Sequence, residues 1–238
     1  MLVDAGFSKR ETFARLASVS ERAESFNAIL ISHEHSDHIR GLESLARDSA
    51  CRDAPIYINA ATRDAITWGR HAKAFEVFEA GQKFTVGDFE ITPFTVPHDA
   101  ADPVAFCFDT QGIRIGVVTD LGYVPELVKR HVAGCQCLIF ESNHDLEMLK
   151  VGPYPWVVKQ RVMSRTGHLS NLATAEFLHD DFDGAAQVLV LAHLSENNNH
   201  PEIARMSAVE ALERRATRQN GLELHLASQS APTRVFQF

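Results

Sequence analysis

The sequence predicts an α/β protein in which strands and helices are mixed along the whole chain. Short apolar runs, such as residues 28–31 and 188–192, have the length of buried strands, and segments with helical spacing separate them. Several of these runs are followed directly by a histidine or a carboxylate. Because α/β proteins place their ligands at strand ends, the same pattern predicts where the functional site lies.

In the N-terminal half, caps and periodicity predict the elements. A helix is expected over residues 8–24, because Ser8 can cap it and Phe13, Leu16 and Val19 recur at three-residue spacing. Strand 28–32 leads into a histidine-rich loop and a helix near 39–48. A strand at 55–58, a helix at 60–69 and antiparallel strands at 74–78, 82–86 and 89–96 follow.

In the C-terminal half, Gln111-Gly112 predicts a hairpin between strands 104–109 and 113–119. The next expected elements are a helix at 123–132, strand 137–141, helices at 154–163 and 170–180, and strand 187–192. A helix at 200–217 has Pro201 in its first turn, and strands 222–227 and 234–236 close a second sheet. No repeat or linker interrupts the chain, so residues 1–238 are expected to form one domain.

The composition is that of an ordinary globular protein, with 45% hydrophobic and 23% charged residues among 238. No apolar run reaches the roughly 18 to 20 residues that a membrane span needs, and no secretory signal is visible. The four cysteines, Cys51, Cys107, Cys135 and Cys137, have no disulfide-framework spacing. Reduced thiols and a cytoplasmic location are therefore expected, although Cys135-x-Cys137 can also be interpreted as half of a metal site.

The segment from His33 to His38 is the most informative part of the chain. It holds three histidines and Asp37 directly after the apolar strand at 28–31. Imidazoles suit zinc and other first-row metals, and carboxylates also bind harder ions. His33 and His35 share a parity, so an extended backbone directs both rings to one point. The competing interpretation is a polar loop that happens to be rich in histidine.

These residues resemble the H-x-H-x-D-H signature of the metallo-β-lactamase-fold hydrolases. Asp4 in Leu-Val-Asp-Ala-Gly resembles the first motif of that family, and His98 in Thr-Val-Pro-His-Asp resembles the third. Asp120 resembles the bridging aspartate at the end of a central strand, and His193 resembles the last metal ligand. The resemblance implies a four-layer αββα sandwich. The chain begins almost on the Asp4 element, so the N-terminal strands are expected to be shortened.

The resemblance also implies two divalent ions, zinc or manganese, with iron also compatible. One ion would be held by His33, His35 and His98, the other by Asp37, His38 and His193, and Asp120 would bridge them. Asp37 would also orient the nucleophilic water, and Asp4 would support a ligand histidine from outside. For Asp4 the competing interpretation is a turn residue before Gly6.

Candidate substrate residues lie later in the chain. His168 precedes Ser170, a natural helix N-cap, and helix N-termini favour anions. His168 is therefore a candidate acid, and Glu141 could orient it. Further candidates for substrate contact are Ser170, Asn143, His144, Lys159, Arg161 and Arg165. The basic residues stand in a stretch without acidic residues in a chain of net charge −8, although a solvated helix surface explains them equally well.

Three runs, Glu-Ser-Asn-His-Asp from Glu141, Gly-His-Leu-Ser-Asn from Gly167 and His-Leu-Ser-Glu-Asn-Asn from His193, look like the YycJ/WalJ-type branch of the superfamily. That resemblance implies a metal-dependent phosphodiesterase, an exonuclease that cleaves by metal-hydroxide attack, with DNA favoured as the substrate and RNA left open. The alternatives are a small-molecule hydrolase of thioesters, lactones or cyclic phosphodiesters, and a non-catalytic scaffold. A homo-oligomer is left open, and a membrane partner is not expected.

Overall fold

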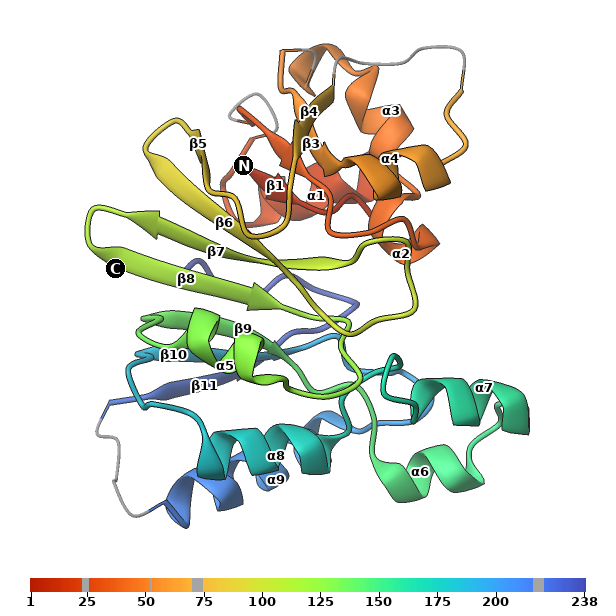
Figure 1. The fold of residues 1–238 in the computed structure, drawn as a ribbon, viewed down its shortest axis with the longest axis vertical. Helices are drawn as coiled ribbons and strands as arrows, with labels where there is room; N and C mark the ends of the chain where they lie inside the picture. Colours follow the sequence, from red (N-terminus) through yellow and green to blue (C-terminus); the bar gives the residue numbers. More distant parts are fainter. Residues whose placement is uncertain (23–25, 52, 70–74, 216–220) are drawn as a thin grey trace. The chain divides into compact units, whose positions relative to one another are not determined.

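The computed structural model describes residues 1–22, 26–51, 53–69, 75–215 and 221–238, which divide into two compact units (Figure 1). Unit 1 consists of Met1–Thr95, Ala100–Phe106 and Arg234–Phe238, and unit 2 of Val96–Asp99 and Cys107–Thr233. The chain thus passes from one unit to the other more than once. Strand β7 (Val104–Thr110) begins in unit 1 and ends in unit 2.

Unit 1 is built on a parallel sheet in the order β1 (Leu2–Val3), β2 (Ile29–Leu30), β3 (Ile56–Asn59) and β4 (Phe75–Phe78). Parallel strands are covered on both faces, which explains why the run around β2 is apolar without alternation. All four residues of 28–31 are fully buried, and the core continues into Leu42, Leu45 and Ile56.

The helices of unit 1 follow the strands closely. They are α1 (Lys9–Ser18), α2 (Ser36–Ile39), α3 (Leu42–Ala46), a 3₁₀ turn at Ser49–Cys51, and α4 (Ala60–Ala65). Ser8 caps α1, since its Oγ accepts the Glu11 N–H at 3.2 Å. Strands β5 (Phe84–Val86) and β6 (Phe89–Thr95) form an antiparallel hairpin.

Unit 2 is built on parallel strands in the order β8 (Ile113–Val118), β9 (Cys137–Glu141), β10 (Val188–Ala192) and β11 (Glu223–Leu226). Strands β7 and β8 meet at Gln111 and Gly112, whose φ angles of 49° and 83° suit a tight hairpin turn. Every residue of β10 is buried, as expected of a strand inside a parallel sheet.

The helices of unit 2 are α5 (Glu126–Val132), α6 (Leu146–Val151), α7 (Trp156–Val162), α8 (Asn171–Asp180) and α9 (Pro201–Glu213). Figure 1 shows α8 and α9 side by side, and α9 also contacts β11. Ser170 caps α8 through its Oγ, which accepts the Ala173 N–H at 3.1 Å, and Pro201 opens α9 as the sequence predicts.

Several predictions about elements are wrong. Strand β4 pairs with β3 in parallel, whereas the sequence predicted an antiparallel strand. The chain returns through α4 between the two strands, as a parallel pair requires. The alternation of side chains along a strand does not encode its direction. Residues 234–236 form no strand and belong to unit 1 rather than to the sheet with β11. Helix α6 was not predicted, and α2 begins at Ser36, inside the histidine segment, whereas a helix was expected only from about residue 39. Residues 23–24, 74 and 216–217 of the predicted elements lie outside the described residues.

Among the described residues, no helix combines the length and the apolar character needed to cross a membrane.

Candidate metal centre

Asp4 holds the loop that follows β2. Its Oδ1 accepts the Ser32 N–H at 2.8 Å, and its Oδ2 accepts the Ser32 hydroxyl at 2.8 Å. The same Oδ2 lies 2.8 Å from Nδ1 of His38. Because a carboxylate can only accept, this contact favours the proton on Nδ1 and the lone pair on Nε2 of His38, the tautomer that a metal-binding histidine needs.

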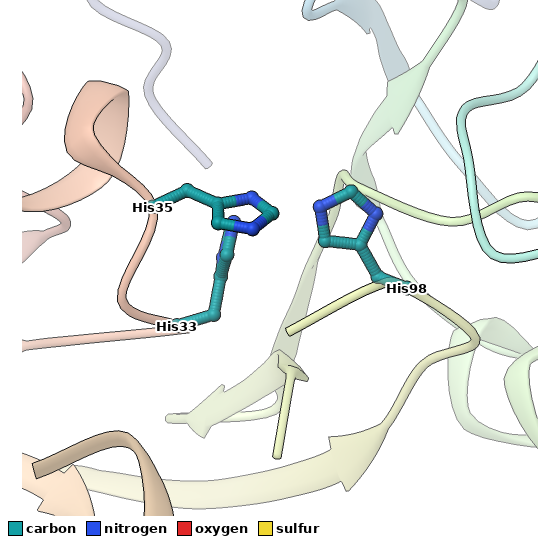
Figure 2. Close-up of side chains that lie close together, drawn as sticks. All are labelled: His33, His35 and His98. Atoms are coloured by element: carbon teal, nitrogen blue, oxygen red, sulfur yellow. The ribbon is translucent and has the colours of Figure 1, made fainter. Parts of the chain in front are cut away.

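The histidines of this loop lie against one another. The rings of His33 and His35 meet edge to face with centroids 4.7 Å apart (Figure 2), and the ring of His38 lies 4.0 Å from that of His33. Nδ1 of His33 is 2.9 Å from the Ser32 hydroxyl. The shared parity of His33 and His35 therefore brings their rings together within unit 1. Asp37, in the same loop, has 62% of its side chain exposed to solvent.

Gly6 lets the Asp4 segment approach α2 closely. A Cβ added at Gly6 would lie 1.5 Å from the carbonyl oxygen of Asp37, so only glycine fits there. The neighbouring Ala5 N–H donates to the His38 carbonyl at 2.6 Å. The Asp-Ala-Gly motif therefore fixes both the side chain and the backbone of the His38 turn.

In unit 2, parallel pairing brings three predicted residues to one sheet edge. Asp120 follows β8, Glu141 ends β9 and His193 follows β10, and these strands are hydrogen-bonded neighbours. Asp120 and His193 have φ angles of 63° and 59°, in the left-handed region. So does Asp4 in unit 1, with φ 58°. Such backbone costs about 1–3 kcal/mol per residue and clusters at functional sites.

Glu141 is the buried centre of this edge. Its Oε1 lies 2.6 Å from Nδ1 of His193 and 3.0 Å from Nδ1 of His168, and its Oε2 accepts the N–H groups of Leu121 and Leu169. Complete burial alone would raise the pKa of Glu141, but the charges and hydrogen bonds of His168 and His193 lower it to about 2. Burial alone would lower the pKa of His168, but Glu141 raises it.

His98, also labelled in Figure 2, follows β6 and joins the same cluster of unit 2. Its Nδ1 donates to the Gly167 carbonyl at 3.0 Å, and its Nε2 lies 3.9 Å from Oδ1 of Asp120. Burial, more than any neighbouring charge, lowers the pKa of His98. The ring of His168 is 5.0 Å from that of His98 and 5.1 Å from that of His193.

The donor atoms of unit 2 suit a divalent metal ion. Asp120, Glu141, His168 and His193 offer ligand atoms within 4.8 Å of one another. His98, His168 and His193 each direct Nδ1 to an oxygen acceptor, which favours the tautomer with the lone pair on Nε2. This outer hydrogen bonding is the usual arrangement of metal-binding histidines.

Two of the predicted substrate residues, Asn143 and His144, are buried and differ in their hydrogen bonding. Asn143 donates through Nδ2 to the His193 carbonyl at 2.8 Å, and so supports the left-handed backbone there. His144 is 1% exposed, and neither ring nitrogen has a hydrogen-bond partner among the described residues. Burial is the main reason that the pKa of His144 is lowered to about 4.

The basic candidates also differ in their surroundings. Lys159 is buried and donates to the Lys150 carbonyl at 2.7 Å, so its ammonium group serves the packing of this segment. Arg161 forms an ion pair with Asp99. Arg165 lies exposed, with its guanidinium carbon 4.1 Å from the centre of the Tyr123 ring.

The sequence analysis missed three supports of the site. Ser32 joins Asp4 to His33, and its place directly before the first histidine was the available signal. The Gly167 carbonyl orients His98, which no side-chain pattern encodes. Asn199 is buried and bonds Asn171 and the carbonyls of Ser142 and Asn143, although the loop it belongs to looked only polar in sequence.

Comparison with known proteins identifies the family of the chain. The family model of the β-lactamase superfamily domain matches residues 1–194, which is most of the chain. The chain belongs to the metallo-β-lactamase superfamily. Its matches to solved structures include the metallo-β-lactamase fold protein YhfI from Bacillus subtilis, with a TM-score of 0.66, 19% identity, and coverage of 94% of this chain and 83% of that one. The predicted α/β fold class is therefore confirmed.

Two curated relatives are closer in sequence. Exodeoxyribonuclease YycJ of Bacillus anthracis is 37% identical over 239 residues, covering 99% of this chain and 89% of the relative. Exodeoxyribonuclease WalJ of Streptococcus pneumoniae is 36% identical over 217 residues, covering 89% of this chain and 80% of the relative. The predicted resemblance to the YycJ/WalJ-type branch is confirmed, and with it membership in a superfamily of metal-dependent hydrolases that generally bind divalent ions.

Proposed function

We propose that this metallo-β-lactamase superfamily member is a dinuclear-metal phosphodiesterase that removes nucleotides from DNA. The observation that carries the proposal is the contact of Glu141, at the end of β9, with both His168 and His193, the latter directly after β10. Two relatives at 36–37% identity that bear the name exodeoxyribonuclease support the reaction class and the choice of DNA.

For the metals, the proposal follows the order of the superfamily motifs. His33, His35 and His98 would hold one ion, Asp37, His38 and His193 the other, and Asp120 would be shared. The hydrogen bonds on Nδ1 of His38, His98 and His193 support this choice, because each favours the tautomer whose Nε2 carries the lone pair that a metal needs. When bound, zinc or manganese ions supply an activated water and neutralise charge on the phosphoryl group.

The protein's own residues then position substrate and protons. Glu141 fixes the ring of His168 through Nδ1, so that Nε2 can donate a proton or hydrogen bond to the departing oxygen. The raised pKa of His168 favours the protonated form that such a donor needs. Asn143 keeps His193 in place by bonding its carbonyl. Asp37, whose side chain is open, would orient the water.

The end of α8 that carries Ser170 would receive a phosphate. The dipole of this ten-residue helix favours an anion at that end, although the Asn171 and Ala173 N–H groups already donate within the protein. Arg165, and Arg161 after release from Asp99, would hold flanking phosphates. We assign Lys159 to packing instead, because its ammonium group is buried against a carbonyl.

We further propose that both units belong to one domain, since the family match runs across both and the chain passes between them repeatedly. A cytoplasmic location fits action on DNA and the reduced thiols of Cys51, Cys107, Cys135 and Cys137, none of which forms a disulfide.

Metal analysis combined with hydrolysis of a simple phosphodiester tests the proposal. Carefully reconstituted protein should contain close to two equivalents, and Asp120→Ala and His35→Ala should lose activity while their circular dichroism stays unchanged. Full activity of Asp120→Ala would contradict the dinuclear assignment.

A further inference from the structure

Unit 1 contains a pocket of about 270 Å³ beside the histidine loop. It is lined from three directions: by Glu34 and Ser36 of the loop, by the start of α3, and by residues 66–69 after α4. Glu34 stands between His33 and His35, so a group bound in this pocket would lie beside the residues that we assign to metal. The proposed function does not use the pocket.

The walls of the pocket are largely apolar and carry one aromatic ring. Ile39, Leu42 and Ile66 line it together with Trp68. The Trp68 ring is held in place, because its Nε1 donates to the Arg63 carbonyl at 2.9 Å and the ring packs 4.6 Å from that of Phe75. A fixed indole at a pocket wall is a surface on which a flat heteroaromatic ring can stack.

Glu34 brings an acceptor to the same pocket. Its Oε1 accepts the Ala101 N–H at 2.8 Å, but its Oε2 is buried and has no hydrogen-bond partner among the described residues. A carboxylate oxygen left in this state costs free energy, and an N–H donor from a ligand would recover it once the Glu34 side chain turns this oxygen into the pocket. Glu43, whose carboxylate pairs with Arg47, adds a second negative group at the pocket.

These features select the ligand. The volume lies just below the range of about 300–1,000 Å³ for pockets that bind drug-sized molecules, which suits one flat ring system. The two carboxylates outnumber the guanidinium of Arg40, which also lines the pocket, and they accept hydrogen bonds from amino groups. We propose that this pocket binds one nucleobase of the DNA strand, stacked on Trp68, with a preference for bases that carry an exocyclic amino group facing Glu34. Cytosine meets this requirement and thymine does not. This inference rests on the proposed function and deepens it by naming a base-binding subsite.

Fluorescence gives a test that needs no catalysis. The chain has two tryptophans, Trp68 and Trp156, and the latter is 60% exposed on α7 in unit 2. Trp156→Phe therefore leaves Trp68 as the only indole. In EDTA, this protein is titrated with single-stranded oligo(dC), oligo(dT) and an abasic strand of equal length. We expect saturable quenching, about tenfold tighter for oligo(dC) than for oligo(dT). Equal quenching of Trp68 by all three strands, or no quenching by any of them, would overturn the inference.

Variants separate the pocket from the reaction. In Trp68→Ala, the ratio of kcat/KM for an ordinary strand to that for the abasic strand should fall about 5- to 150-fold, the effect of losing one stacked base. Trp68→Phe should recover much of that ratio. The melting temperatures of both variants show whether the pocket residues are still folded. Glu34→Gln should reduce the preference for oligo(dC), and Trp156→Phe is the matched control.

If the protein hydrolyses DNA and these ratios stay at wild-type values, the base-binding inference is wrong and the nuclease proposal stands. If oligo(dC) quenches Trp68 as expected but no phosphodiester is cleaved, the pocket is supported and the proposed reaction is wrong.

Discussion

Nδ1 of His193 lies 2.6 Å from Oε1 of Glu141, and that same oxygen lies 3.0 Å from Nδ1 of His168. One fully buried carboxylate thus orients a proposed metal ligand and a proposed acid. Glu141 is the last residue of β9, and parallel pairing with β10 sets its place beside His193. The sheet register therefore determines the geometry of the site.

Replacing Glu141 by glutamine should damage both histidines at once. Four donors surround the carboxylate, from His168, His193, Leu121 and Leu169, and an amide would turn its own NH₂ group toward some of them. We expect a loss of about 1–3 kcal/mol in the free energy of unfolding. Metal affinity or activity should fall about 10- to 100-fold.

Chemical unfolding and metal titration measure these losses. Glu147→Gln is the matched control, because that side chain is 78% exposed on α6. Wild-type metal affinity and activity in Glu141→Gln would show that the carboxylate does not position His193 or His168.

His168→Ala should lower turnover of a phosphodiester by about 10²–10⁴-fold, the usual contribution of a positioned acid. Metal content should remain that of the wild type, because His168 is not in the proposed ligand set. His179→Ala, at a 44% exposed position on α8, controls for the loss of an imidazole. A parallel loss of metal in His168→Ala would instead make His168 a ligand.

Gly6→Ala should disrupt the histidine loop although it adds one methyl group. The new Cβ would meet the Asp37 carbonyl at 1.5 Å, a distance that only a backbone shift can relieve. We expect a destabilisation of more than about 1 kcal/mol, comparable with overpacking in a core, and weaker metal binding. Thermal melting with and without zinc checks this, and an unchanged response to zinc would contradict the tight Gly6–Asp37 approach.

His144→Phe should make the metal-free protein less sensitive to acid. The pKa of His144 is lowered from 6.5, its ordinary value, to about 4 in the folded protein. The neutral ring therefore contributes its full stability above pH 6.5, and this contribution is lost as the pH falls toward 4, because the unfolded chain takes up the proton first. The shift corresponds to a contribution on the order of 3 kcal/mol. Phenylalanine has a similar shape and loses no hydrogen bond, because both ring nitrogens lack partners among the described residues.

Urea unfolding of metal-free wild type and His144→Phe at pH 7 and pH 4 measures the difference. Identical losses of stability in the two proteins would mean that His144 does not titrate with a lowered pKa.

The sequence alone predicts the elements that carry chemistry better than it predicts their connections. Residues 28–31 and 188–192 are strands because an apolar run buried on both faces has few alternatives. The direction of β4 and the absence of a strand at 234–236 depend on tertiary pairing, which local patterns do not contain.

For the site, Asp4, Glu141 and His168 could be selected from motifs, since each follows or ends a strand-like run or precedes a helix cap. The roles of Asn143 and Lys159 could not be predicted. Their polar groups bond backbone carbonyls of His193 and Lys150, and only the folded chain shows which carbonyls are near.

The most direct test of the central claim is the product analysis of one metal-replete preparation given end-labelled single-stranded and double-stranded DNA, and in parallel a thioester and a lactone. The account predicts stepwise release of nucleotides from DNA that EDTA abolishes, that zinc or manganese restores, and that Asp120→Ala lacks. Ready hydrolysis of the thioester or lactone with every phosphodiester left intact would contradict it and would identify a small-molecule hydrolase of the same fold.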